Sequence, residues 1–194
     1  MDRDVRRDAR IEGSVIVEQY RAFARYNTGM NARLYALAAT LSDVERRADR
    51  GAFFRSIHGT FNHLLLTDRA WLFRFTHDPA LAESRDADGA LIIPRELDHE
   101  LYADFDLLRR ERARTDRDIE TWVDGLDDAR LAAPLRYRTT KGVPHEHPLW
   151  QAVTHFFNHQ THHRGQLTTL FMQLGHDPGV TDLIAFVRDE QPAR

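Results

Sequence analysis

Val153-Thr-His-Phe-Phe-Asn-His-Gln-Thr-His-His-Arg-Gly-Gln166 is predicted to form one helical segment, in which His155, His159 and His163 follow one another at four-residue steps. Because an α-helix turns by about 100° per residue, these imidazoles lie within about 40° of the His159 direction. The residues that share this direction to within about 60° are Ala152, Phe156, Gln166, Leu170 and Leu174. The stripe is therefore expected to face the interior, where a metal ion is the simplest reason for several imidazoles.

Apolar residues recur at helical spacing in three further parts of the chain. The long helices that this periodicity predicts span about residues 14–40, 54–75, 101–125 and 148–174. A short polar helical turn is expected at about residues 42–51, and a short C-terminal helix at about residues 181–187.

Two connections between the long helices differ from the rest. Residues 76–98 contain Pro79, Gly89 and Pro94 and have no sustained period, so they are predicted to form a long crossover loop. A connection of this length is unusual in a small helical domain and suggests a functional lid. Residues 131–148 alternate in polarity around a turn signal, which predicts a small hairpin before the last long helix.

Together these elements predict an all-α protein built as a four-helix bundle with one long crossover. A length of 194 residues with 42% hydrophobic residues is typical of one domain, so residues 1–194 are expected to form a single unit. The charged residues 1–13 are expected to be a flexible or loosely docked N-terminus.

The charge, the apolar segments and the lack of cysteine argue against several classes of function. A formal net charge of −3 with no basic face gives no support for nucleic-acid binding, and no stretch approaches the length of a membrane span. The N-terminus has no apolar segment of the signal-peptide kind, so a cytoplasmic location without membrane contact is expected. The chain has no cysteine, so any thiol chemistry must use a thiol from outside.

The best candidate metal ligands are His159 and His163, because an i, i+4 pair of histidines supplies two imidazoles from adjacent turns. The third ligand is expected from the second long helix, where we favour His63. His58 is the rival on that helix, but it lies about 140° from His63 around the axis. Gln160 occupies the position where a zinc protease helix would need its catalytic glutamate, which argues against peptide hydrolysis.

Residues next to these histidines have weaker assignments. His155 is expected either behind the metal ligands, hydrogen-bonded to one of them, or on the substrate side, and Gln166 could orient a ligand or a water molecule. Arg164 is predicted to point outward, and Asp68 to hold Arg69 or a backbone group. His162 is expected in packing or at an interface, and solvent exposure is expected for His145 and His147; with His58, these three histidines have no assigned role in the site.

Two segments carry a resemblance to a known family. Ser56-Ile-His-Gly-Thr-Phe-Asn-His-Leu-Leu-Leu-Thr-Asp-Arg-Ala-Trp71 and Thr154-His-Phe-Phe-Asn-His-Gln-Thr-His-His-Arg-Gly-Gln166 resemble the DinB family, also described as DinB/YfiT-like metalloenzymes. The Asn-His-x-x-x-His-Arg-Gly-Gln core of the second segment is the specific part. The similarity in layout extends over nearly the whole chain.

The resemblance implies an up-down-down-up four-helix bundle, often a homodimer, with a divalent metal held by three histidines. Matched position by position, these are His63, His159 and His163. The expectation of a dimer also rests on the aromatic residues Phe157 and Trp150, which are predicted to point outward.

The resemblance also implies thiol-dependent transferase or isomerase chemistry, in which the metal activates a low-molecular-weight thiol. Our leading hypothesis is a metal-dependent transferase that adds an external thiol to a small electrophile in stress or detoxification metabolism. Zinc, nickel, iron and cobalt suit three imidazoles about equally.

Two other functions remain open at this point. In a metal-dependent hydrolase, a general base would be required, and Glu96, Asp98 and Glu100 are candidates that spacing does not separate. In a non-catalytic metal- or ligand-binding stress protein, the metal would only join two helices. Full coordination by the protein, for instance with His155 as a fourth ligand, would favour this last function.

Overall fold

The computed structural model describes residues 14–190, which form eight helices and two small antiparallel hairpins. The helices are α1 (Val15–Ala39), α2 (Asp43–Arg47), α3 (Ile57–Thr76), α4 (Pro79–Ala82), α5 (Phe105–Asp124), α6 (Asp128–Ala132), α7 (Leu149–Gln173) and α8 (Leu183–Glu190). The strands are β1 (Ser84–Arg85) paired with β2 (Leu91–Ile92), and β3 (Pro134–Arg138) paired with β4 (Pro144–Pro148). The predicted mostly helical class is confirmed, while the predicted loose N-terminus, residues 1–13, lies outside the described residues.

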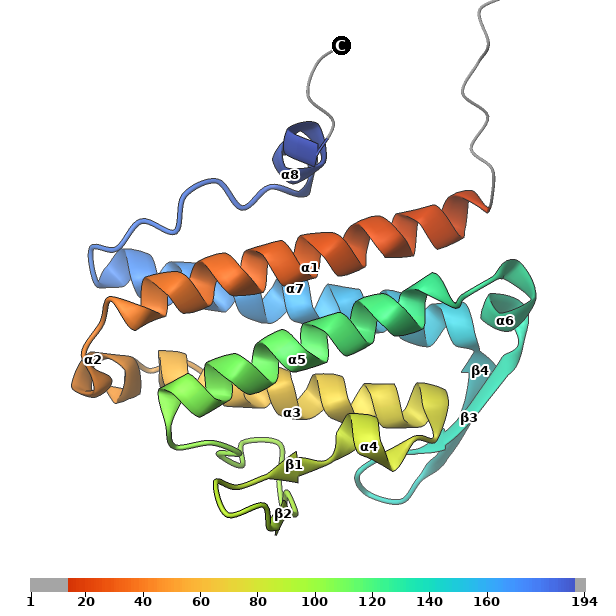
Figure 1. Cartoon of the computed structure of the whole chain (residues 1–194), viewed down its shortest axis with the longest axis horizontal. Helices are drawn as coiled ribbons and strands as arrows, with labels where there is room; N and C mark the ends of the chain where they lie inside the picture. Colours follow the sequence, from red (N-terminus) through yellow and green to blue (C-terminus); the bar gives the residue numbers. More distant parts are fainter. Residues whose placement is uncertain (1–13, 191–194) are drawn as a thin grey trace, which may run out of the picture.

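The four long helices α1, α3, α5 and α7 lie side by side (Figure 1). Both α1 and α3 contact α5 and α7, and α8 packs on α1. The β3–β4 hairpin and α6 lie at one end of these helices, and α2 lies at the other end. The long helices begin and end within a few residues of their predicted bounds, because the apolar periodicity that predicted them is also what packs them.

The interior consists of two apolar clusters separated by polar residues. The cluster nearer α2 includes Leu34, Phe61, Leu65, Leu108 and Phe171, and the cluster nearer the β3–β4 hairpin includes Tyr20, Leu72, Ile119, Val153 and Phe156. The side chains between the clusters are buried and polar, and we call them the polar layer: Asn27 and Asn31 of α1, Asp68 of α3, Arg112 and Asp116 of α5, and Gln160 and Arg164 of α7. All four long helices therefore meet at one polar level.

Charged hydrogen bonds hold the polar layer together. Arg112 Nη1 donates to Asp68 Oδ2 over 2.6 Å, and Arg112 Nη2 lies 2.7 Å from Asp116 Oδ1. The Asn31 side chain donates to the Asp116 carboxylate over 3.0 Å. The prediction that Asp68 holds Arg69 or a backbone group is therefore wrong, because the facing α5 places Arg112 within reach.

The prediction that Arg164 and Phe157 point outward is also wrong. Arg164 is buried and donates to Asn27 Oδ1, and Phe157 is buried with its ring 6.1 Å from that of Tyr20 and 5.7 Å from that of Phe23. The reason is that α7 is covered on two faces, by α3 on the histidine side and by α1 on the side of Arg164. The prediction considered only one buried face of α7, the one that carries the histidines.

The segment between α3 and α5 has more structure than the predicted loop. It contains α4, which begins at Pro79, and the β1–β2 hairpin. Its last part is anchored in the interior by Leu101 and Tyr102, which are both buried. This crossover segment runs beside α3 (Figure 1) and thereby brings its backbone close to His63.

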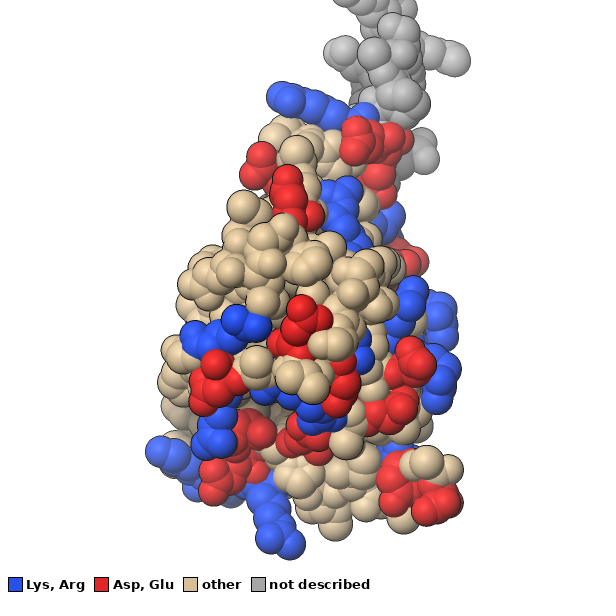
Figure 2. Space-filling view, turned by 90° about the vertical axis from the view of Figure 1, so that its left-hand side faces the viewer, with Lys and Arg blue, Asp and Glu red and all other residues tan. Residues whose placement is uncertain are grey.

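The surface shows no large region of one charge on the face drawn in Figure 2, where basic and acidic side chains are interspersed. Among residues 14–190, no helix has both the length and the apolar character that crossing a membrane requires.

Candidate metal centre

His63 of α3 and His159 and His163 of α7 meet between these two helices. Their candidate ligand nitrogens all lie within 4.8 Å of one another. The His159 Nε2 atom lies 3.3 Å from His63 Nε2 and 3.0 Å from His163 Nε2. The structure thus brings together the three histidines singled out from the sequence, in a buried to half-buried group that is compatible with metal binding.

The outer nitrogens of two rings are occupied by hydrogen-bond acceptors. His63 Nδ1 donates to the carbonyl oxygen of Leu97 over 2.8 Å, and His163 Nδ1 donates to Gln166 Oε1 over 2.8 Å. A neutral imidazole carries only one N–H, so these bonds leave Nε2 of both rings as a lone pair. Both lone pairs face His159, whose Nε2 could offer at most one hydrogen. One contact therefore stays unsatisfied, and a bound cation would satisfy all three nitrogens.

The side-chain amide of Gln166 is oriented so that its oxygen accepts the hydrogen bond from His163. Its amide Nε2 lies 3.2 Å from His162 Nε2, which directs Oε1 toward the His163 ring. His162 is exposed and lies outside the three-histidine group, so its contact to Gln166 is a supporting one. Carboxylates and carbonyl oxygens in this position fix the tautomer and the direction of a metal-ligating histidine.

Replacing Gln166 with leucine is expected to lower the affinity for a divalent metal by about 10- to 100-fold, the usual effect of losing such a partner. The affinity can be measured by competition with a chromophoric chelator. Gln166→Glu, which keeps an acceptor oxygen, should retain most of the affinity. Gln173→Leu, at the exposed end of α7, is the matched control, and an equal loss in this control would contradict the assignment.

Phe54 covers one side of the site. Its ring stacks on His63 with centroids 3.7 Å apart and an interplanar angle of 17°, and it lies 5.5 Å from the ring of His163. Gly59 permits this position, because a Cβ at Gly59 would lie 2.3 Å from the backbone oxygen of Phe54. A glycine in the first turn of α3 is therefore required for the turn that places the Phe54 ring over the histidine.

Burial keeps the three imidazoles neutral at neutral pH. Burial, with a smaller contribution from the neighbouring histidines, lowers the pKa of His63 to about 4 and that of His159 to about 3. Burial also lowers the pKa of His163. A neutral imidazole is the form that binds a metal ion, so the site does not need to lose protons before binding at pH 7.

His155 lies beside the group but outside it. Its ring is 5.9 Å from the ring of His159 and 5.3 Å from that of Trp71, and its side chain is more exposed than the three candidate ligands. It therefore lies between Trp71 and His159. His145 is exposed as expected, whereas the expected exposure of His147 is wrong, because its ring is half-buried against Tyr137 of the hairpin. His145 also lies against Tyr137, and neither histidine belongs to the three-histidine group.

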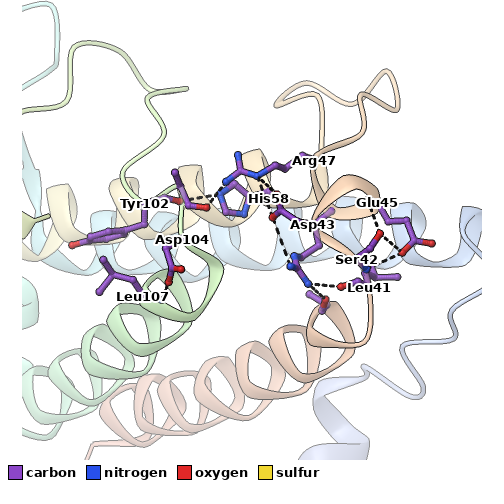
Figure 3. A network of polar contacts seen from close by, with 12 residues as sticks. Leu41, Ser42, Asp43, Glu45, Arg47, His58, Tyr102, Asp104 and Leu107 are labelled. Atoms are coloured by element: carbon purple, nitrogen blue, oxygen red, sulfur yellow. Dashed lines mark hydrogen bonds and ion pairs between the residues drawn. The ribbon is translucent and has the colours of Figure 1, made fainter. Parts of the chain in front are cut away.

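His58 points to a different part of the molecule. Its Nε2 atom lies 2.9 Å from the carbonyl oxygen of Tyr102 and 3.8 Å from Glu100. Glu100 in turn pairs with Arg47, which also binds Asp43. Figure 3 shows the His58 ring in this network, where α2, α3 and the start of α5 meet. The rotation of about 140° from His63 around the helix axis accounts for the separation.

A cavity of 1120 Å³, which we call the α3 cavity, adjoins this site. It is bounded by α3, by the crossover segment and by the β3–β4 hairpin with its turn. Phe54 and Leu97 line the cavity, and both also contact His63. The Leu97 contact could not be predicted from the sequence, because every residue type carries the same backbone carbonyl.

Residues 16–194 match the family model described as the DinB family, which covers all of α3 and α7 and therefore all three histidines. No curated protein matches the chain. The matched range also includes the crossover segment and the hairpin that bound the α3 cavity.

Proposed function

The chain belongs to the DinB family, and on that premise we propose that it binds one divalent metal ion through His63, His159 and His163 and transfers an external thiol to a small electrophile. The observation that carries the metal proposal is the crowding of three Nε2 atoms, two of which are fixed as lone pairs by bonds on their far sides. Without a cation, at least one of these lone pairs has no hydrogen-bond partner in a buried place.

The three-histidine group supports a catalytic metal rather than a purely structural one. A structural zinc site is closed by four protein ligands, whereas a catalytic site keeps a position for substrate. Among the described residues, the candidate group contains three histidines, and His155 stands apart from it. When bound, a divalent ion lowers the pKa of a thiol and so supplies a nucleophile.

The chain's own residues would position this chemistry. Leu97 and Gln166 hold the rings of His63 and His163, while Phe54 covers the site and limits the entry of water. The thiol must come from outside, because the chain has no cysteine. The α3 cavity would hold the thiol or the electrophile next to the histidines, since Phe54 and Leu97 belong to its lining and contact His63. Glu100, a candidate base for hydrolysis, is instead paired with Arg47.

We extend the proposal to the family architecture, an up-down-down-up four-helix bundle that forms a homodimer and acts in stress or detoxification metabolism. The pairing of α1 and α3 with both α5 and α7 supports the bundle. The half-exposed Trp150 supports a dimer, but the burial of Phe157 removes the other aromatic residue on which that expectation relied.

Cobalt provides the test, because its absorption spectrum reports both the metal site and a thiol ligand. The cobalt-loaded protein is expected to show a new near-ultraviolet charge-transfer band when mercaptoethanol is added. His159→Ala should show neither bound cobalt nor the band. A protein that binds cobalt with an unchanged spectrum at saturating thiol would contradict the transferase function, and a protein that binds no divalent metal would contradict the whole proposal.

A further inference from the structure

The α3 cavity has more basic than acidic side chains. Five arginine and lysine residues line it, of which Arg69 is paired with Glu111. The other four, Arg74, Arg95, Arg138 and Lys141, make no ion pair within residues 14–190. Two carboxylates, Glu96 and Asp98, also line the cavity. Four unpaired cations against two carboxylates leave a positive excess in a space large enough for a small molecule.

Arg74 differs from the other three because it is half-buried, whereas Arg95, Arg138 and Lys141 are exposed. Its guanidinium lies 4.5 Å from the ring centroid of Trp71 and 5.4 Å from that of Tyr137. Cation–π contacts hold a guanidinium through its face and leave its N–H groups free at the edge.

The structure shows no hydrogen bond from Arg74 to any described side chain or backbone group within residues 14–190. Exposed arginines are satisfied by water, and the chain has many of them, so Arg95 and Arg138 need no special explanation. A half-buried guanidinium with unused donors is less favourable, because burial removes part of its hydration. An anionic ligand would restore the lost interactions through charge-assisted hydrogen bonds.

The position of Arg74 sets the shape of such a ligand. Arg74 and His63 are eleven residues apart on α3, a rise of about 16 Å. Between them, Trp71 lies next to His155, and His155 lies next to His159. The walls between the two ends include the apolar side chains of Leu66, Phe73 and Leu101. A ligand that uses both ends must therefore be elongated, with an apolar or neutral middle.

We propose that the α3 cavity binds an elongated small molecule whose reacting end lies at the three histidines and whose other end carries an anionic group, such as a carboxylate, bound by Arg74. This inference rests on the proposed function, because it names the class of molecule that this site would take. The anionic group belongs either to the thiol or to the electrophile, and the recognition chemistry at Arg74 is the same for both.

The test uses mercaptoalkanoates of increasing length, from mercaptoacetate to mercaptoundecanoate, each compared with the mercaptoalcohol of equal length. Dissociation constants for the cobalt-loaded protein are measured from the cobalt spectrum and by calorimetry. In the wild-type protein, a long mercaptoalkanoate is expected to bind about tenfold more tightly than its alcohol, the effect of a hydrogen bond to a charged group. The shortest pair should show no preference that depends on Arg74, because mercaptoacetate cannot span the cavity and its carboxylate can reach only the metal.

Three variants identify the residue responsible. Arg74→Gln should abolish the preference for the long carboxylate without changing the affinity for the alcohol. Arg74→Lys should keep part of the preference, because it retains the charge but loses the planar donors. Arg117→Gln, which removes an exposed arginine of α5 outside the cavity, is the matched control and should behave as wild type. Melting temperatures establish that each variant is folded.

The source of the anionic group follows from a second titration. If undecanoate binds together with mercaptoethanol and the binding requires Arg74, the anion belongs to the electrophile. If undecanoate and mercaptoundecanoate compete while mercaptoethanol excludes undecanoate, the anion belongs to the thiol.

Equal affinities for carboxylate and alcohol at every length, or a preference unchanged in Arg74→Gln, would overturn the inference. Cobalt binding and the thiol band would then still support the proposed function, whereas their absence would defeat that function first.

Discussion

Replacing His159 with alanine is expected to abolish stoichiometric metal binding. His159 is the central residue of the group, since its Nε2 atom contacts Nε2 of both other histidines. Loss of a partner behind a ligand commonly costs about 10- to 100-fold in affinity, so loss of the ligand itself should cost at least about 100-fold. The measurement is elemental analysis of untagged protein, with wild type and variant purified in parallel.

His155→Ala is the matched control for this experiment, because it removes the neighbouring imidazole one turn away on the same helix. It should retain one equivalent of metal and the stabilisation against thermal unfolding that a bound ligand provides. Equal metal content in wild type and His159→Ala would show that the three-histidine group is not the site. Loss of metal in His155→Ala alone would place a ligand where the structure does not.

The second large effect is expected in the polar layer, where Arg112→Met should lower the free energy of unfolding by about 3–5 kcal/mol. Arg112 bonds Asp68 and lies between Asp68 and Asp116, and all three side chains are buried. Removing the guanidinium leaves two carboxylates without their cation in the protein interior. Urea denaturation followed by circular dichroism measures the change.

Arg117→Met, on the exposed side of the same helix, is the control and should change the free energy of unfolding by no more than about 0.5 kcal/mol. The variant with both Asp68→Asn and Arg112→Met should lose less than the sum of the two single changes, because each removes the other's unpaired charge. A loss below about 1 kcal/mol for Arg112→Met would mean that water enters the layer and hydrates the carboxylates.

Much of the fold could be predicted from the sequence, because a helix with one buried face has apolar residues at every third or fourth position. The long helices, the hairpin before α7 and the short C-terminal helix all occur where the periodicity placed them. The stripe of His159 and His163 also follows from spacing within one helix, and His63 follows from the need for a facing ligand. These predictions depend on local geometry, which a sequence encodes directly.

The wrong predictions concern side chains whose burial or binding partner is determined by another helix. Arg164 and Phe157 lie off the histidine stripe and were predicted to be exposed, but α1 covers that side of α7. Asp68 was assigned to its neighbour in sequence, whereas its partner, Arg112, comes from another helix. The carbonyl of Leu97 and the free edge of Arg74 depend on how the crossover segment and the hairpin dock against α3, which residue spacing does not reveal.

Because of the hydrogen bond between Leu97 and His63, the crossover segment takes part both in metal binding and in the binding of a small molecule in the α3 cavity. The same segment holds a ring of the three-histidine group and forms a wall of the α3 cavity. Thermodynamic coupling is reciprocal, so a molecule that orders this segment on binding must raise the affinity for metal by the same factor by which metal raises the affinity for that molecule. Metal occupancy in a cell would then follow the concentration of the small molecule as well as that of the metal.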